Sequence, residues 1–217
     1  MSRGLFLVVE GVEGAGKSTQ VGLLTAWMDG LGIPHVLARE PGGTPVGEAI
    51  RKIVLTRGEL TMPAETELFL ILAARAAFVR DVVRPALDRG ELVLADRFDL
   101  STMAYQGYGR GLDLQEVRRA NDIATGGLRP DLTLVLDLPV SEGLRRKGGA
   151  AQGDRIEREG EPFLVRVREG YLALATGGGE IRLFDASTTP ETLQGELRTS
   201  LMEAFPGTFP PVGVEQT

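Results

Sequence analysis

The sequence predicts an α/β fold in which a parallel sheet is covered by helices on both faces. Short apolar runs rich in Leu and Val recur along the chain, segments with helical periodicity separate them, and turn residues bound them. Alternation of strand and helix is typical of parallel sheets with right-handed crossovers. The runs lack an alternating polar face, as expected of strands that are buried on both sides.

Five apolar runs are the predicted strands: Leu5–Glu10, His35–Ala38, Leu92–Ala95, Leu132–Asp137 and Ile181–Phe184. Three segments have apolar residues at helical spacing: Val21, Leu24, Met28 and Leu31; Phe163, Val167, Tyr171 and Leu174; and Leu193, Leu197 and Leu201. Two helix starts carry capping residues: Asp113 with Glu116, and Thr189 before Pro190. Helices are therefore expected between the strands.

Length and composition indicate a globular protein without a basic surface. The chain has 217 residues, of which 42% are hydrophobic and 25% charged, and its 24 Lys plus Arg against 30 Asp plus Glu give a net charge of −6. This balance argues against nucleic acid or an anionic membrane as a partner. The absence of cysteine excludes disulfides and thiolate metal sites and fits a reducing, cytoplasmic location. No segment is long enough to span a membrane, and Leu5–Val9 is too short for a signal peptide.

Residues 1–205 are predicted to form one domain, and residues 206–217 an irregular, Pro-rich tail. One stretch within the domain has a different composition. Residues 143–160 combine several glycines with five basic side chains: Arg145, Arg146, Lys147, Arg155 and Arg158. We expect this stretch to form a small, basic lid.

Residues 11–18, Gly-Val-Glu-Gly-Ala-Gly-Lys-Ser, match the phosphate-binding loop pattern and lie between the first predicted strand and the first predicted helix. Glycines allow several backbone N–H groups to converge on phosphate oxygens, and the helix N-terminus adds the positive end of its dipole. Lys17 supplies a mobile cation, and Ser18 supplies a hydroxyl ligand for Mg²⁺. The loop therefore predicts a nucleotide phosphate site.

The loop alone does not distinguish a kinase from a nucleotide-dependent switch or motor. A GTPase switch carries Asn-Lys-x-Asp after a later strand, and the sequence contains no such motif. Asp96 ends the third predicted strand, where a second carboxylate can reach the Mg²⁺ shell, and Arg97 follows it directly. With Arg39, Arg51 and Arg75 upstream, the arginines exceed what one nucleotide needs. These residues favour a kinase site that holds two phosphate-bearing substrates. The alternatives are a kinase for another nucleoside monophosphate or for a deoxynucleoside, and a nucleotide-dependent switch protein.

Six ordered motifs make the chain resemble the bacterial thymidylate kinases: E-G-V-E-G-A-G-K-S-T-Q at 10–20, R-E-P-G-G-T at 39–44, A-A-R at 73–75, D-R-F-D-L-S-T-M-A-Y-Q-G at 96–107, R-P-D-L-T-L-V-L-D at 129–137 and D-R-I-E at 154–157. The resemblance covers Leu5 to about Ala175. It implies a P-loop NTPase-type fold with a five-stranded parallel sheet and a lid. It also implies ATP as donor, dTMP as acceptor, Mg²⁺ as cofactor and a homodimer.

The resemblance assigns roles to individual residues. Glu13 is expected near the metal and the acceptor's 3′-hydroxyl, and Ser18 and Asp96 are the metal ligands. The residues expected to bind ATP are Gly11, Val12, Glu13, Gly14, Ala15, Gly16, Lys17, Ser18 and Thr19. For dTMP, Arg97 and Arg51 are expected to bind the phosphate, and Arg75 is expected to bind a thymine carbonyl. The Tyr105 ring is expected to lie against C2′ of the sugar. The other residues expected to contact dTMP are Glu13, Glu40, Pro41, Ile71, Thr102 and Gln106. Lys17, Glu13 and Arg97 are expected to be catalytic.

Ala15 stands where one branch of the family has an arginine. Catalysis of phosphoryl transfer depends on the placement of cations, so the resemblance implies that the lid supplies this charge, from Arg145, Arg146 or Arg155.

Ile71 lies four residues before Arg75, where the family usually has a phenylalanine that stacks on thymine. Phe69 is about 120° away around the helix and cannot take its place. Weaker stacking, an aliphatic contact or a ring supplied by Phe98 is expected instead.

Overall fold

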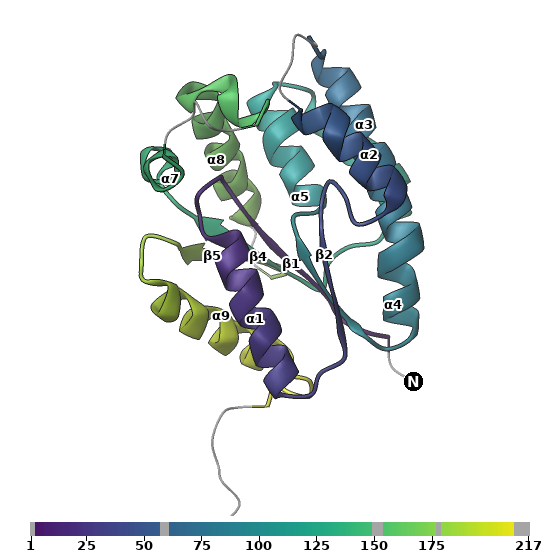
Figure 1. Cartoon of the computed structure of the whole chain (residues 1–217), viewed down its shortest axis with the longest axis vertical. Helices are drawn as coiled ribbons and strands as arrows, with labels where there is room; N and C mark the ends of the chain where they lie inside the picture. Colours follow the sequence, from purple (N-terminus) through teal and green to yellow (C-terminus); the bar gives the residue numbers. More distant parts are fainter. Residues whose placement is uncertain (1–2, 57–60, 149–153, 177–178, 211–217) are drawn as a thin grey trace, which may run out of the picture.

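The computed structural model describes residues 3–56, 61–148, 154–176 and 179–210. Its centre is a five-stranded parallel sheet with the strand order β2-β3-β1-β4-β5 (Figure 1). The strands are β1 (Phe6–Gly11), β2 (His35–Arg39), β3 (Leu92–Asp96), β4 (Leu132–Asp137) and β5 (Ile181–Asp185). All five predicted strands are confirmed, with their ends within one residue of the expected positions.

Helices connect successive strands. β1 leads into α1 (Lys17–Gly30), and β5 leads into α9 (Pro190–Ala204). Between β2 and β3 lie α2 (Pro45–Leu55), α3 (Ala64–Phe78), the π-helical η1 (Val79–Val83) and α4 (Arg84–Asp88). Between β3 and β4 lie α5 (Asp99–Thr102), the π-helical η2 (Met103–Gly109) and α6 (Leu114–Thr125). Between β4 and β5 lie α7 (Val140–Arg146), the 3₁₀ turn η4 (Glu157–Glu159) and α8 (Glu161–Ala175).

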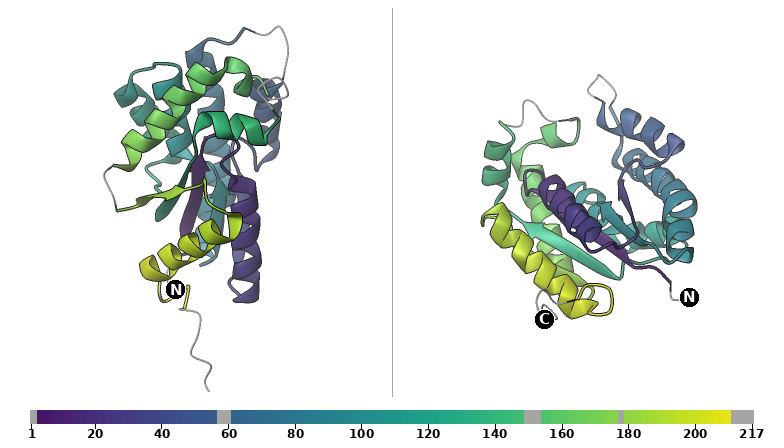
Figure 2. Two further views of the ribbon diagram at one scale, coloured as in Figure 1. Left: turned by 90° about the vertical axis from the view of Figure 1, so that its left-hand side faces the viewer. Right: turned by 60° about the horizontal axis from the view of Figure 1, so that its bottom comes forward.

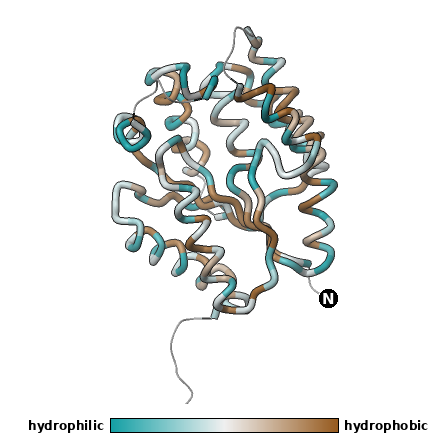
Figure 3. The backbone as a smooth tube through the Cα atoms, in the orientation of Figure 1, coloured by the Kyte–Doolittle hydropathy of each residue, from teal (hydrophilic) through white to brown (hydrophobic). Residues whose placement is uncertain are grey.

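Alternate side chains of β1 enter two separate parts of the core. Leu7 and Val9 lie in a cluster with apolar residues of α1 and α9, whereas Phe6 and Val8 lie in a cluster with residues of α3 and α4. Figure 2 shows α1 and α9 side by side, and Figure 3 shows the apolar strands at the centre of the molecule. The predicted layers are therefore confirmed: helices cover both faces of the sheet.

Burial differs between the inner and outer strands. β1 is buried throughout, and β3 and β4 are buried except for their final aspartates. The outer strands β2 and β5 leave alternate residues exposed. The prediction that the strands are buried on both faces is therefore wrong for these two. Within the described residues, no helix is long and apolar enough to cross a membrane.

Both predicted helix starts are confirmed by their hydrogen bonds. The Asp113 carboxylate accepts from the N–H groups of Gln115 and Glu116, each at 2.9 Å, and begins α6. The Thr189 hydroxyl accepts from Thr192 N–H at 3.2 Å and begins α9. Each side chain satisfies a donor that the first helical turn leaves without a backbone partner.

Aromatic stacking holds the first part of the predicted tail against the domain. Phe209 is fully buried, and its ring stacks on Trp27 of α1 with 5.1 Å between centroids. Residues 206–210 have no regular secondary structure, and residues 211–217 lie outside the described part of the chain. Trp27 belongs to the hydrophobic core.

The register brings the carboxyl ends of three strands together. Val9 of β1 lies opposite Asp96 of β3, which lies opposite Arg39 of β2. The phosphate-binding loop after β1 and Arg97 after β3 therefore emerge at the same edge. The crevice at this edge is where open α/β sheets bind their ligands.

Candidate active site

All three glycines of the loop at 11–18 adopt backbone conformations that other residues rarely take, and Gly11 has φ of 139°. Gly14 has φ of 77° and Gly16 has φ of 88°. A Cβ on Gly14 would lie 2.4 Å from the carbonyl oxygen of Gly143 on α7, so the loop packs directly on α7, the helix in which the predicted lid begins. The loop passes into α1 at Lys17, as the phosphate-site prediction requires.

Lys17 is buried, and its ammonium group turns back on the loop. Nζ donates to the carbonyl oxygens of Gly11, at 3.0 Å, and Val12, at 2.9 Å. Burial, reinforced by repulsion from Arg97, lowers the pKa of Lys17 to about 8. A bound anionic phosphate would counter both effects, because it favours the charged form.

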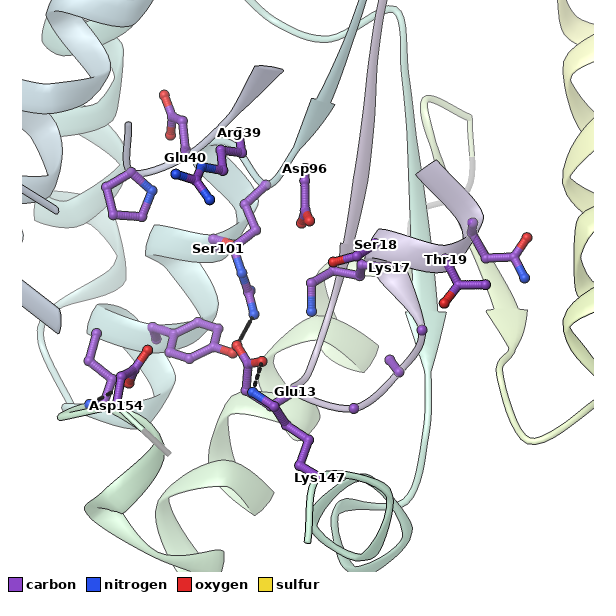
Figure 4. Close-up of a pocket in the computed structure, with 18 of the residues that line it drawn as sticks. Glu13, Lys17, Ser18, Thr19, Arg39, Glu40, Asp96, Ser101, Lys147 and Asp154 are labelled. Carbon is purple, nitrogen blue, oxygen red and sulfur yellow. Dashed lines mark hydrogen bonds and ion pairs between the residues drawn. The ribbon is translucent and has the colours of Figure 1, made fainter. Parts of the chain in front are cut away.

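Glu13 connects the phosphate loop to two cations from distant parts of the chain. Its Oε1 accepts from Arg97 Nη2 at 2.5 Å, and its Oε2 accepts from Lys147 Nζ at 3.2 Å (Figure 4). Burial opposes its ionisation, but Lys17, Arg97 and Lys147 outweigh burial and hold its pKa well below the usual range. Glu13 is therefore an ionised carboxylate in the middle of a cationic site.

A single cavity of about 840 Å³ joins the phosphate loop to the arginines. Arg97, Arg51 and Arg39 line it opposite the loop. Arg51 Nη1 donates to the Pro41 carbonyl oxygen at 2.9 Å. The structure therefore brings together the residues predicted for the donor and the acceptor phosphates.

Arg75 lines the far end of the cavity, and almost all of its surface is buried, with 1% exposed. Its guanidinium donates to Glu40 Oε2, at 2.8 Å from Nε and 2.6 Å from Nη2, to Thr102 Oγ1 and Asn121 Oδ1, each at 2.6 Å, and to the Phe98 carbonyl oxygen at 2.8 Å. These contacts use all five N–H groups of an arginine. A bond from Arg75 to a base would thus replace one of them.

Burial raises the pKa of Glu40 to about 7, despite the attraction of Arg75. The cavity wall also includes five residues that were predicted to surround the acceptor nucleoside: Pro41, Ile71, Thr102, Tyr105 and Gln106.

The ring proposed to replace the stacking phenylalanine, Phe98, does not line the cavity. Phe98 is fully buried in the core and packs edge-on against Phe6 and Phe78, at 4.8 and 6.4 Å between centroids. Phe69 is 65% exposed. The expectation that Phe98 supplies stacking is therefore wrong, and Ile71 itself lines the cavity.

The lid arginines are not gathered at the phosphate loop. Arg155 donates from Nε to the Val54 carbonyl oxygen at 2.7 Å and forms an ion pair with Glu67, so it lies against α2 and α3. Arg145 is 73% exposed and pairs with Glu142. These partners hold both guanidinium groups away from the loop in this structure, and the catalytic roles of Arg145 and Arg155 stay predictions. The described part of the lid comprises residues 143–148 and 154–160, and residues 149–153 lie outside it. Four residues of this part line the cavity: Arg146, Lys147, Asp154 and Ile156.

Arg146 is anchored at the side of the cavity formed after β5. Its Nη1 donates to the Ala186 carbonyl oxygen at 3.2 Å, and its Nε donates to Glu142 at 3.0 Å. Lys147 instead points to the centre of the phosphate site, where it contacts Glu13 (Figure 4).

Three residues with defined places in the site were not singled out by sequence patterns. Lys147 was noted only as one of the five basic side chains of the predicted lid and was given no role in the site. Asn121 and Glu67 are buried polar residues within helices, and neither belongs to a motif. Glu67 accepts from Gln106, Arg110 and Arg155, and so joins the acceptor end of the cavity to the lid.

Ser18 and Asp96 both line the cavity beside the loop, as expected of ligands for Mg²⁺. A hydroxyl and one carboxylate suit this ion, which in phosphate sites takes few protein ligands and completes its shell with phosphate oxygens and water. Among the described residues, no group of three or more acidic, His or Cys side chains is arranged to hold a metal on its own. The donor set therefore fits a metal that arrives with a nucleotide.

A parallel sheet with a phosphate loop after its central strand, facing arginines across one cavity, defines a P-loop phosphotransferase. The family model described as thymidylate kinase matches residues 9–197. By this match and by its relatives, the chain belongs to the thymidylate kinase family.

Individual relatives agree over most of the chain. A thymidylate kinase of Desulforudis audaxviator is 53% identical over 174 residues, which cover 80% of this chain and 78% of the relative. One from Pseudomonas putida is 47% identical over 195 residues, which cover 89% and 93%. The crystal structure of thymidylate kinase from Ehrlichia chaffeensis superposes with a TM-score of 0.73 at 28% identity and covers 92% of this chain and 99% of that one.

We expect the affinity for ATP to fall as the pH rises above about 8, because Lys17 has a pKa of about 8 in the free protein. The phosphate charge raises the pKa of Lys17 when ATP binds. The contribution of Lys17 to the binding free energy is therefore complete below the pKa of the free protein, and it is lost as the pH rises through the pKa of the complex. Calorimetric titration at about pH 8.5 in buffers of different ionisation enthalpy should show proton uptake. Binding without proton uptake, or uptake that persists in Lys17→Ala, would contradict the expectation.

Proposed function

We propose that the chain transfers the γ-phosphate of ATP to dTMP, giving ADP and dTDP. The observation that carries the proposal is the arrangement of the cavity: Lys17 and the phosphate loop face Arg97 across the Glu13 carboxylate. Donor and acceptor phosphates held by these two groups would meet in line near Glu13. Positioning and placed cations supply most of the catalysis of phosphoryl transfer.

At the acceptor end, Arg97 and Arg51 would bind the dTMP phosphate. Arg97 lies over the Tyr105 ring, with its Cζ 5.0 Å from the ring centroid, and its Nη2 donates to the Tyr105 hydroxyl at 3.0 Å. Tyr105 is thereby fixed in the cavity wall, where its ring would lie beside the sugar and oppose a 2′-hydroxyl. Ile71, Thr102 and Gln106 would contact the base, with aliphatic contact in place of ring stacking.

At the donor end, the backbone N–H groups of the loop and Lys17 would bind the ATP phosphates, and Ser18 and Asp96 would hold Mg²⁺. When bound, Mg²⁺ neutralises charge on the phosphate oxygens. Arg146, Ala186 and Pro190 line the part of the cavity next to α1 and α9, which leaves this part for the donor base.

We assign the lid cation to Lys147. Its ammonium group already lies within 3.2 Å of Glu13, whereas Arg155 and Arg145 are held by carboxylates away from the loop. Lysine is suited to such a contact because its ammonium group, on a flexible stem, can exchange a carboxylate partner for a phosphate.

Acceptor choice tests the function directly. We expect dTMP, supplied with MgATP, to be phosphorylated in preference to dUMP, CMP, AMP and GMP, with ADP and dTDP formed in equal amounts. Chromatographic measurement of both products for each acceptor checks this. Preference for dUMP or CMP would favour a kinase for another monophosphate, and ATP hydrolysis without an acceptor would favour a switch protein.

Substitutions in the lid separate the two candidate cations. Lys147→Ala should lower kcat by about tenfold or more, because a cation at the transferred phosphate is lost, and should leave the melting temperature unchanged, because Lys147 is 40% exposed. Arg155→Ala should instead lower the melting temperature, because it removes a partner from the buried Glu67.

Lys52→Ala, at an exposed position on α2, is the matched control and should change neither quantity. A normal kcat for Lys147→Ala together with a large loss for Arg155→Ala would return the role to the arginine.

A homodimer formed through α2, α3 and α6 is also proposed. α3 packs against both other helices, and the three carry exposed apolar residues: Val46, Ile53, Phe69 and Ile123. Exposed apolar side chains on neighbouring helices favour a protein interface. Sedimentation velocity should give a dimer that Phe69→Asp or Ile123→Asp converts to a monomer, whereas Leu183→Asp on β5 should remain dimeric. A monomeric unmodified protein would contradict the proposal.

A further inference from the structure

Arg97 is held in a strained backbone conformation. Its φ is 76°, and it is the one non-glycine residue of the described ranges with a positive φ. Such a conformation persists only where the surroundings fix it on several sides. The N–H of Arg97 donates to the Val9 carbonyl oxygen at 3.0 Å, which fixes the side of the residue that faces β1.

Glu10 fixes the other side. It is the residue before the phosphate loop, has no exposed surface, and accepts four hydrogen bonds. Oε1 accepts from the N–H groups of Phe98, at 2.8 Å, and Ser101, at 3.0 Å. Oε2 accepts from the hydroxyls of Ser101, at 2.6 Å, and Tyr171, at 2.8 Å. The carboxylate therefore holds the turn that follows Arg97 and also gathers two hydroxyl groups.

These two hydroxyls then hold the guanidinium. The Ser101 and Tyr171 hydroxyls both lie within donating distance of Glu10, and they are 2.9 Å from each other, so either can also donate to the other. Their oxygens also present lone pairs, and both accept from Arg97 Nη1, each at 3.1 Å. Nη2 donates to the Tyr105 hydroxyl at 3.0 Å and to Glu13, which lines the cavity and whose place a phosphate would take. One end of the guanidinium is thus anchored while the other is presented to a ligand.

We propose that Tyr171, with Glu10 and Ser101, is a positioning residue for the acceptor phosphate. It orients Arg97 from behind without lining the cavity itself. Tyr171 comes from α8, the helix that follows the lid, so the orientation of the acceptor arginine depends on the packing of that helix. This inference rests on the proposed function, in which Arg97 binds the phosphate of dTMP.

Tyr171→Phe tests the inference, because it removes only the hydroxyl. We expect the dissociation constant and KM for dTMP to rise about tenfold, as for loss of a hydrogen bond to a charged group. The KM for MgATP and the inhibition constant of thymidine should stay within about twofold, because thymidine lacks the phosphate that Arg97 would bind. Ser101→Ala should behave in the same way. Tyr108→Phe is the matched control: Tyr108 packs on Gly170 of α8 and should leave all these values unchanged.

A double-mutant cycle isolates the path through Arg97. If Tyr171 acts by orienting the guanidinium, adding Tyr171→Phe to Arg97→Ala should weaken dTMP binding no further. Equal losses for dTMP and thymidine, additive losses in the cycle, or normal dTMP binding by both Tyr171→Phe and Ser101→Ala would overturn the inference. The proposed function would survive each of these results. Failure of the unmodified protein to phosphorylate dTMP would overturn both.

Discussion

The site depends on the balance of charge within one cavity. Binding two phosphate-bearing substrates requires many cations close together, and before any ligand arrives these cations repel one another. Buried or half-buried carboxylates offset that repulsion. Glu10, Glu13, Glu40 and Glu67 each accept from two or more donors, and each contacts an arginine of the site directly or through hydroxyl groups. Burial, with repulsion from Arg97 added, lowers the pKa of Lys17, whereas attraction by the nearby cations outweighs burial and lowers the pKa of Glu13.

The carboxylates divide into fixed and exchangeable partners. Glu40 holds Arg75 with two short bonds in a fully buried pair, and removal of either partner would leave an uncompensated charge. Glu13 is different, because it is partly accessible and lines the cavity. Under the proposed function, entering phosphates, which carry the same sign of charge as Glu13, would compete with it for Lys147 and Arg97. The first kind of pair builds the wall of the site, and the second kind keeps its cations in place until substrates replace the carboxylate.

Local sequence signals were sufficient to predict the sheet, the phosphate loop and both capped helix starts, because each depends on residues close together in the chain. The partners within the site were not predictable in this way. Arg155 meets Glu67 across 88 positions, Lys147 meets Glu13 across 134, and Tyr171 meets Glu10 across 161. A basic lid was expected from composition, but composition does not reveal which cation a distant carboxylate will capture. Phe98 was misjudged for the same reason, since its side chain is taken up by Phe6 and Phe78 in the core.

The unequal use of arginine and lysine follows from these two kinds of contact. Three of the 24 basic residues are lysines. Arg75 and Arg97 occupy positions where several donors with fixed directions are satisfied together, which suits a planar guanidinium. Lys17 and Lys147 instead contact loop carbonyls and Glu13, partners that a phosphate can replace as the ammonium group turns. Under the proposed function, arginine would fix the acceptor side of the cavity, whereas lysine would serve the side where charge moves during the reaction.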